Sequence, residues 1–280
     1  MKQQTIQKNM IPPYEASMRE AEKSAATIEK YLRSIQAFVA RYAGRKIDKA
    51  LVLEYKAGLG AAYAPASANS ALAAVNGFLR FWELEDCCVK PFKTQKAVYC
   101  PEEKELTREE YIRLVRAAKD KNSERLALVL ETICATGIRV SELKYITAEA
   151  VLRGEAIVTC KGKTRTVFLP AALQKALRRY MQSQDIRTGS VFVTRTGKPM
   201  NRSNIWREMK ALCQRAGVSE SKVFPHSLRK LFARTFYSID HDVAKLADIL
   251  GHSNINTTRI YIIASGAEHR RKMDTMHLVL

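Results

Sequence analysis

Apolar residues in the first ninety positions recur at the spacing of helix faces and never alternate as they would in a strand. Between residues 24 and 43 they fall three and four positions apart, which is typical of an amphipathic helix. We predict a second helix over 67–84, capped by Ser67, and a shorter one over 46–56. Residues 1–89 are therefore predicted to form an all-helical N-terminal domain.

Helical periodicity stops over 90–106, a lysine-rich stretch with two prolines that we interpret as a linker. A second domain is predicted over 107–280. Thr107 and Glu110 have the spacing of a capping box at a helix start, and Gly137 interrupts the helices that follow. Further helices are predicted over 123–136, 171–181, 201–216, 227–238, 242–250 and 257–264.

Strand signals occur only where these helices pause. Residues 156–159 and 166–169 are rich in β-forming residues and flank the basic tetrad 161–164, so we predict a β hairpin. A short third strand is predicted over 191–194, ended by Gly197 and Pro199. The predicted fold class is mainly α with a small antiparallel sheet.

Charge points to a polyanionic partner. The chain has 47 Lys and Arg against 28 Asp and Glu, a net charge of +19. Residues 151–215 alone contain 14 basic and 3 acidic residues, which favours a surface that follows nucleic-acid phosphates. A merely solvated basic surface is the alternative. An anionic membrane is disfavoured, because no run approaches the ~20 apolar residues of a spanning helix.

Several chemistries lack their motifs. The sequence has neither a Walker-type loop nor a GxGxxG motif, and no carboxylate cluster at two-metal spacing. The N-terminus lacks an apolar core and a small-residue cleavage site, so no signal peptide is expected. The six cysteines form no CxxC pair, so we expect reduced cysteines and a cytoplasmic location at the nucleoid. No cofactor or metal is expected. Phosphodiester chemistry would then need a protein nucleophile and cationic side chains.

Candidate residues for such chemistry lie in three short segments. Arg139 lies in CATGIRVSEL, and His226 and Arg229 share one face of a helix start in FPHSLRKLF. His252 follows a helix that Gly251 caps in ILGHSNINTTRIYI, and Tyr261 lies nine residues further on. Taken singly, each has an ordinary alternative: a surface ion pair for the arginine, a structural role for a histidine, a core position for the tyrosine.

Taken in order, these segments resemble the tyrosine recombinase (phage integrase) family. ATGIRVSEL is similar to the first arginine box of that family, and PHSLRKLFA with LGHSNINTTRIYI to its second. SAATIEKYLRSIQAFVARY and ANSALAAVNGFLRFW resemble its helical core-binding domain. The resemblance covers about residues 14–265, and the short stretch before it favours an Xer-like or transposon-borne recombinase without an arm-binding domain.

The resemblance implies a role for each candidate residue. Tyr261 would be the nucleophile, and Arg139 and Arg229 would contact the non-bridging oxygens of the scissile phosphate. His226 and His252 would donate hydrogen bonds to that phosphate or carry the nucleophile's proton. Lys161, in the hairpin turn, would protonate the leaving 5′ oxygen.

Three positions qualify this assignment. The hairpin CKGKTRTVFLP is slightly shorter than is usual in the family, which makes Lys163 a rival of Lys161. Lys230 stands where many members have a second histidine. Glu142, three residues after Arg139, is predicted to hold that guanidinium, although an ordinary surface pair is the alternative.

The resemblance also implies an assembly. Two domains would form a C-shaped clamp around duplex DNA, two copies would bind inverted half-sites, and two dimers or a related recombinase would form a tetramer that passes through a Holliday junction. Residues 267–280 would pack into a neighbouring protomer or fold back on their own domain. A type IB topoisomerase activity and a non-catalytic DNA-binding protein are the alternatives.

Overall fold

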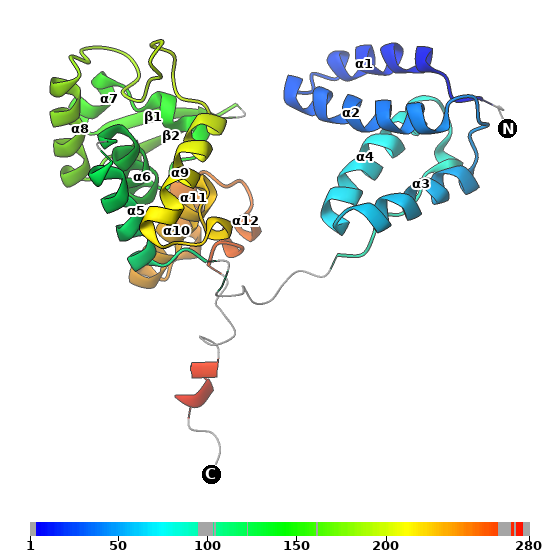
Figure 1. Cartoon of the computed structure of the whole chain (residues 1–280). Coiled ribbons are helices and arrows are strands. Elements are labelled where there is room, and N and C mark those ends of the chain that lie inside the picture. The colour runs from blue at the N-terminus through cyan, green and yellow to red at the C-terminus, as the bar shows by residue number, and fades with distance from the viewer. Residues whose placement is uncertain are drawn as a thin grey trace. The chain divides into compact units, whose positions relative to one another are not determined.

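The computed structural model describes residues 4–94, 103, 105–121, 123–160, 162–262, 270–271 and 273–276. The chain divides into two compact units, residues 1–96 and 97–280 (Figure 1). This division falls inside the 90–106 segment, part of which lies outside the described residues, and the domain limits predicted above stay predictions. Most of the predicted C-terminal segment 267–280 also lies outside them.

The first unit consists of helices, apart from an isolated β bridge between Thr5 and Lys46 in its described part. Its helices are α1 (Ile11–Glu20), α2 (Ala25–Tyr42), α3 (Lys49–Ala62) and α4 (Pro65–Phe81), with short 3-10 helices η1 (Lys8–Met10) and η2 (Glu85–Cys87). The apolar stripe of α2 packs against α4 around the buried rings of Phe38 and Phe78. This burial holds the unit together.

Two helix boundaries differ from those predicted. α4 begins at Pro65 with Ala64 as its N-cap, so Ser67 is not the cap. The fixed φ of proline suits the first position of a helix, and it sets this start three residues earlier than a cap at Ser67 would. α3 begins at Lys49, where Asp48 is the N-cap, and runs to Ala62, beyond the predicted end at 56. α1 was not predicted.

The second unit is built around its central helix α6 (Glu124–Thr136), which is apolar on most sides. α6 contacts α5 (Arg108–Asp120), α8 (Ala171–Ser183) and α10 (Pro225–Asp240). The capping box of Thr107 and Glu110 is confirmed at the start of α5. The remaining elements are η4 (Val140–Tyr145), α7 (Ala148–Arg153), α9 (Arg202–Ala216), η5 (Glu220–Lys222), α11 (Val243–Leu250) and α12 (Ile255–Arg259). The short helix α7 was not predicted.

A single antiparallel pair makes up the described sheet: β1 (Glu155–Cys160) and β2 (Lys163–Phe168). Glu155 pairs with Phe168 and Cys160 with Lys163, so residues 161–162 alone connect the strands. The predicted turn of four residues is therefore too long, because Gly162 adopts a positive φ that suits a tight hairpin. The fold class, mainly α with a small antiparallel sheet, is confirmed.

The predicted third strand over 191–194 is wrong. Only Val193 forms a β bridge, with Pro199, and Thr194 closes a local loop through the backbone of Lys198. The segment pairs with its own continuation rather than with the hairpin. Val191 and Phe192 are nevertheless buried, which explains the strand-like composition of the segment.

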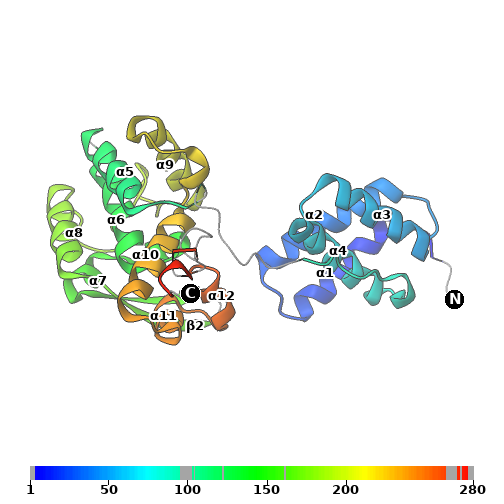
Figure 2. The same cartoon turned by 90° about the horizontal axis from the view of Figure 1, so that it is seen from below.

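The elements that carry the predicted site residues lie next to one another in the second unit. α10, α11 and α12 form one group beside β2, as Figure 2 shows. Among the described residues, no helix is long and apolar enough to span a membrane.

Candidate active site

Five of the six predicted site residues come together in the second unit, from segments far apart in the sequence. We call them the site cluster: Arg139, His226, Arg229, His252 and Tyr261. The sixth, Lys161, lies outside the described residues.

Two glycines with positive φ lead the chain into the site cluster. Gly137 ends α6 and Gly251 ends α11, each at φ +64°. This left-handed conformation carries little strain in glycine. A Cβ on Gly137 would also overlap the ring of Phe232. The predicted C-cap role of Gly251 is confirmed, and it delivers His252 to the site.

Arg229 is the most deeply buried cation of the cluster, at 1% exposed. It lies in the second turn of α10 and donates hydrogen bonds to the carbonyl oxygens of Gly137 and Leu250, the latter at 2.7 Å. Burial, and next the charge of Arg139, lower the pKa of Arg229 to about 10. The guanidinium thus stays charged at neutral pH and joins the ends of α6 and α11.

His252 has a defined protonation state. Its Nε2 lies 3.0 Å from Nη2 of Arg229, and its Nδ1 lies 2.8 Å from Oγ1 of Thr258. A guanidinium only donates, so Nε2 accepts and the ring proton is assigned to Nδ1, which donates to Thr258. Burial first, and then the charges of Arg229 and Arg139, lower the pKa of His252 to about 4.

Tyr261 lies between the two imidazoles. Its hydroxyl oxygen is 3.4 Å from Nδ1 of His226, and its ring centroid is 5.3 Å from that of His252. The guanidinium of Arg229 lies 5.9 Å from the centre of the same ring. Burial, followed by the charge of Arg229, lowers the pKa of His226. A neutral imidazole therefore stands within reach of the phenol at neutral pH.

Arg139 is held by Glu142, as predicted. Nη1 of Arg139 donates to Oε1 of Glu142 at 2.8 Å, and its backbone N–H donates to Oε2 at 2.9 Å. Its Nη2 lies 3.3 Å from the carbonyl oxygen of Gly251. Burial alone would raise the pKa of Glu142, but hydrogen bonds from Arg139 and the charge of Arg165 lower it. The Arg139 side chain remains 33% exposed, so it can still meet a phosphate.

Arg165 was not predicted as a site residue. Its Nη2 donates to Oε2 of Glu142 at 2.7 Å, so one carboxylate serves two guanidiniums. The signal that could have found it is strand alternation. Arg165 shares the face of β2 with Val167, which is buried, whereas Thr166 between them is exposed.

Lys230 pairs with Glu105 at 2.6 Å. Arg234 pairs with the same carboxylate. These three side chains line a cavity of about 470 Å³ that also reaches His226 and Tyr261. Lys230 thus forms an ion pair beside the site cluster.

The identity of the lysine that acts with this cluster stays a prediction. Lys161 lies outside the described residues, and of Lys163 the backbone alone is described, at the start of β2. No group of three or more His, Cys, Asp or Glu side chains in the described parts could hold a metal ion. Cys87, Cys88, Cys134 and Cys213 are free thiols.

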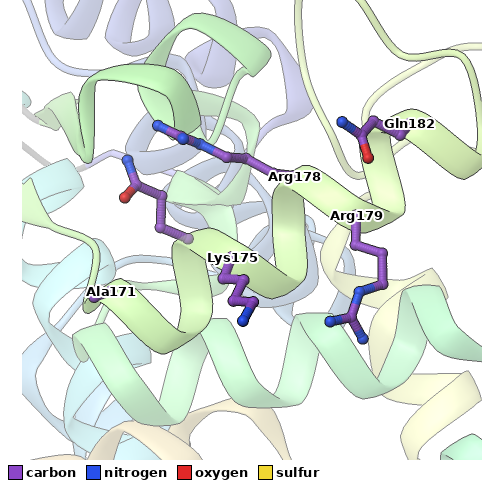
Figure 3. Close-up of a pocket in the computed structure, with 6 residues that line it drawn as sticks. Ala171, Lys175, Arg178, Arg179 and Gln182 are labelled. Carbon is purple, nitrogen blue, oxygen red and sulfur yellow. The ribbon is translucent and has the colours of Figure 1, made fainter.

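Part of the basic 151–215 stretch lies away from the site cluster. The exposed face of α8 carries Lys175, Arg178 and Arg179 around a hollow of about 320 Å³ (Figure 3). Both views of the fold place α8 at the edge of the unit opposite α12. A phosphate-binding role for this part of the stretch stays a prediction.

Several solved structures share this fold. The λ integrase dimer bound to a COC′ core site matches with a TM-score of 0.75 at 17% identity, over 92% of this chain and 95% of that one. XerH bound to its difH substrate matches with a TM-score of 0.69 at 18% identity, over 97% and 90% of the two chains. XerA recombinase matches at 25% identity with a TM-score of 0.54, over 97% and 98%. The fold is that of DNA recombinases and integrases.

Residues 104–268 match the model of the phage integrase family, and the chain belongs to this family. It is 31% identical over 220 residues to the tyrosine recombinase XerA of Thermococcus kodakarensis, covering 75% of this chain and 74% of that protein. The XerA of Pyrococcus furiosus is 26% identical over 289 residues, 100% and 98% of the two chains. The chain is thus an enzyme that breaks and rejoins DNA strands.

Proposed function

We propose that this enzyme is a site-specific recombinase that cuts DNA by forming a 3′-phosphotyrosyl ester on Tyr261. The observation that carries the proposal is the position of the Tyr261 hydroxyl, 3.4 Å from His226 Nδ1 and beside the buried guanidinium of Arg229. A structural tyrosine would need neither a neutral imidazole at its hydroxyl nor a buried guanidinium beside its ring.

Cleavage then follows from the groups present. The phenol oxygen of Tyr261 attacks the scissile phosphorus, and its proton passes to His226, whose lowered pKa leaves a ring nitrogen free. The bond between phosphorus and the 5′ oxygen breaks, and the leaving oxygen takes a proton from Lys161. Rejoining reverses these steps, so the ester conserves the bond energy and no ATP is needed.

Positive charge stabilises the transition state. Arg139 is exposed enough to donate to non-bridging oxygens, where a guanidinium forms two parallel hydrogen bonds. Arg229 uses three of its five N–H groups to bind Gly137, Leu250 and His252, so it positions His252 and adds its charge to the site. Removal of one such donor typically costs ~3–4 kcal/mol of barrier. These fixed cations do the work that a metal ion does in other phosphotransfer enzymes.

We infer that the partner is duplex DNA with inverted half-sites, bound by a dimer and exchanged in a tetramer through a Holliday junction. The λ integrase neighbours are a dimer on a core site and a tetramer on a Holliday junction, which supports this assembly. Integration or excision of a mobile element and Xer-like resolution are the biological roles that fit.

A suicide substrate tests the nucleophile. On a nicked duplex whose 5′ product diffuses away, the wild-type protein should form a covalent adduct that Tyr261→Phe does not form, while Tyr261→Phe still binds the duplex. Tyr237→Phe, a change in α10, should form the adduct normally. An adduct formed by Tyr261→Phe, or one that requires divalent ions, would refute the proposal.

The same assay tests the general acid. Replacing the bridging 5′ oxygen with sulfur gives a leaving group that needs no proton, so it should restore cleavage by Lys161→Ala. Restoration of Lys163→Ala instead would move the role by two residues. Relaxation of supercoiled DNA without any strand exchange between two sites would favour the topoisomerase alternative.

A further inference from the structure

Arg165 points inward from the hairpin. β2 pairs it with Val158, which is buried, and only 14% of the Arg165 side chain is exposed. A long cationic side chain on an inward face needs partners, because burying an unpaired charge is costly. Its partners lie on two other elements of the unit.

The two terminal nitrogens of the Arg165 guanidinium bind separate segments. Nη2 donates to Oε2 of Glu142 at 2.7 Å, and Nη1 donates to the carbonyl oxygen of Ile249 at 3.1 Å. Glu142 belongs to η4, and Ile249 is the penultimate residue of α11. One guanidinium therefore joins the hairpin, η4 and the carboxyl end of α11.

Arg139 binds the same two segments as Arg165. Arg139 also binds Glu142, and its other arm reaches the carbonyl oxygen of Gly251. The Arg165 stem runs directly over Gly251, where a Cβ would lie 2.6 Å from Cδ of Arg165. Glu142 is 2% exposed, so its charge is screened little and depends on both guanidiniums.

We propose that Arg165 is a positioning residue that locks the β1–β2 hairpin onto the site cluster. The inference rests on the proposed function, because the residue that Arg165 would align with the scissile phosphate is the general acid assigned to the hairpin turn. Removing Arg165 releases the hairpin from Glu142 and α11, so protonation of the leaving oxygen suffers most. A merely structural arginine would affect every substrate equally.

Two DNA substrates separate these roles. Arg165→Ala should cleave the ordinary suicide duplex roughly a hundredfold more slowly than wild type, the size expected when one aligned catalytic interaction is lost. On the duplex with the bridging 5′ sulfur, its deficit should shrink at least about tenfold. Thr166→Ala, the exposed neighbour on the same strand, should behave as wild type on both duplexes.

Arg165→Lys is the control that separates loss of positioning from loss of folding. Lysine keeps the charge but cannot span Glu142 and Ile249 together, so this variant should melt near the wild-type temperature, bind DNA and show the same recovery with sulfur. Equal deficits on both duplexes, or cleavage by Arg165→Ala as fast as by Thr166→Ala, would overturn the inference. An adduct in Tyr261→Phe would instead reject the proposed function, whatever Arg165 does.

Discussion

Nε2 of His252 accepts a hydrogen bond from Nη2 of Arg229 at 3.0 Å, and this contact keeps the imidazole neutral. Protonation of Nε2 would place a second positive charge against the guanidinium. Burial is the larger cause, and burial and the neighbouring charges together lower the pKa of His252 to about 4 from its ordinary value of 6.5. A histidine that carries a charge at pH 6 in most proteins is neutral here.

The first prediction concerns this titration. In the DNA-free protein the His252 ring should keep its proton on Nδ1 at pH 6 and titrate near pH 4, as measured from imidazole nitrogen shifts by NMR. Because the unfolded chain protonates near pH 6.5 and the native one near 4, the unfolded state binds more protons between these values. The free energy of unfolding should therefore fall as the pH drops from 6.5 to 4. A midpoint near 6.5 would contradict the assigned tautomer.

Arg229→Gln should impair both folding and cleavage. Glutamine supplies neither the charge nor the reach to satisfy the carbonyl oxygens of Gly137 and Leu250, and each unpaired buried group costs about 1–3 kcal/mol. We expect a clear loss of unfolding free energy in urea and at least ~10²-fold slower adduct formation. Wild-type stability in this variant would show that the buried guanidinium does not join α6 to α11.

Glu142→Gln should destabilise the protein strongly at neutral pH. The change leaves Arg139 and Arg165 facing each other without their shared carboxylate, and breaking a buried pair costs about 3–5 kcal/mol. Glu54→Gln, which removes an exposed pair with Arg45, should cost less than about 1 kcal/mol. Urea unfolding of both variants at pH 7 measures the difference.

The pH dependence of that difference follows from the lowered pKa of Glu142. The contribution of its charge is fully present above the ordinary carboxyl pKa of 4.5 and is lost as the pH falls through the lower native value. The gap between wild type and Glu142→Gln should therefore narrow below pH 4.5. A gap that widens in acid would contradict the direction of this shift.

Gly251→Ala should disturb the site more than an ordinary glycine substitution. A left-handed φ costs a non-glycine residue about 1–2 kcal/mol, and here the new Cβ also meets the Arg165 stem at 2.6 Å. Gly197→Ala is the matched control, since Gly197 has φ +75° and nothing within 4 Å of its Cβ position. We expect Gly251→Ala to be the less stable variant in urea and to cleave more slowly. Equal effects at the two glycines would show that Arg165 does not run over Gly251.

Features that depend on neighbours in the chain were predictable. The capping box at Thr107 and the C-cap at Gly251 involve residues a few positions apart, and the structure confirms both. The hairpin was predicted from its β-forming runs, although its turn is two residues rather than four. Prediction failed where one local pattern is compatible with two structures. The segment 191–194 has the composition of a strand, but it forms a loop with the residues that follow it.

Relationships between distant segments were not predictable. The pairing of Lys230 with Glu105 and that of Arg165 with Glu142 join side chains from different elements. Neither pair has a spacing that would single it out among the many charged residues of a basic chain. Strand alternation indicates that Arg165 points inward, but it says nothing of the carboxylate that the side chain meets.

The sequence by itself determined most of the helices, the two strands of the hairpin and the order of the candidate site residues, because propensity, caps and motif order are written in neighbouring positions. Only the tertiary structure decided that Arg229 is buried while Arg139 stays partly exposed, that His252 is neutral, and that Glu142 serves two guanidiniums. Charge states and hydrogen bonds depend on desolvation and on distances between atoms, and folding sets both.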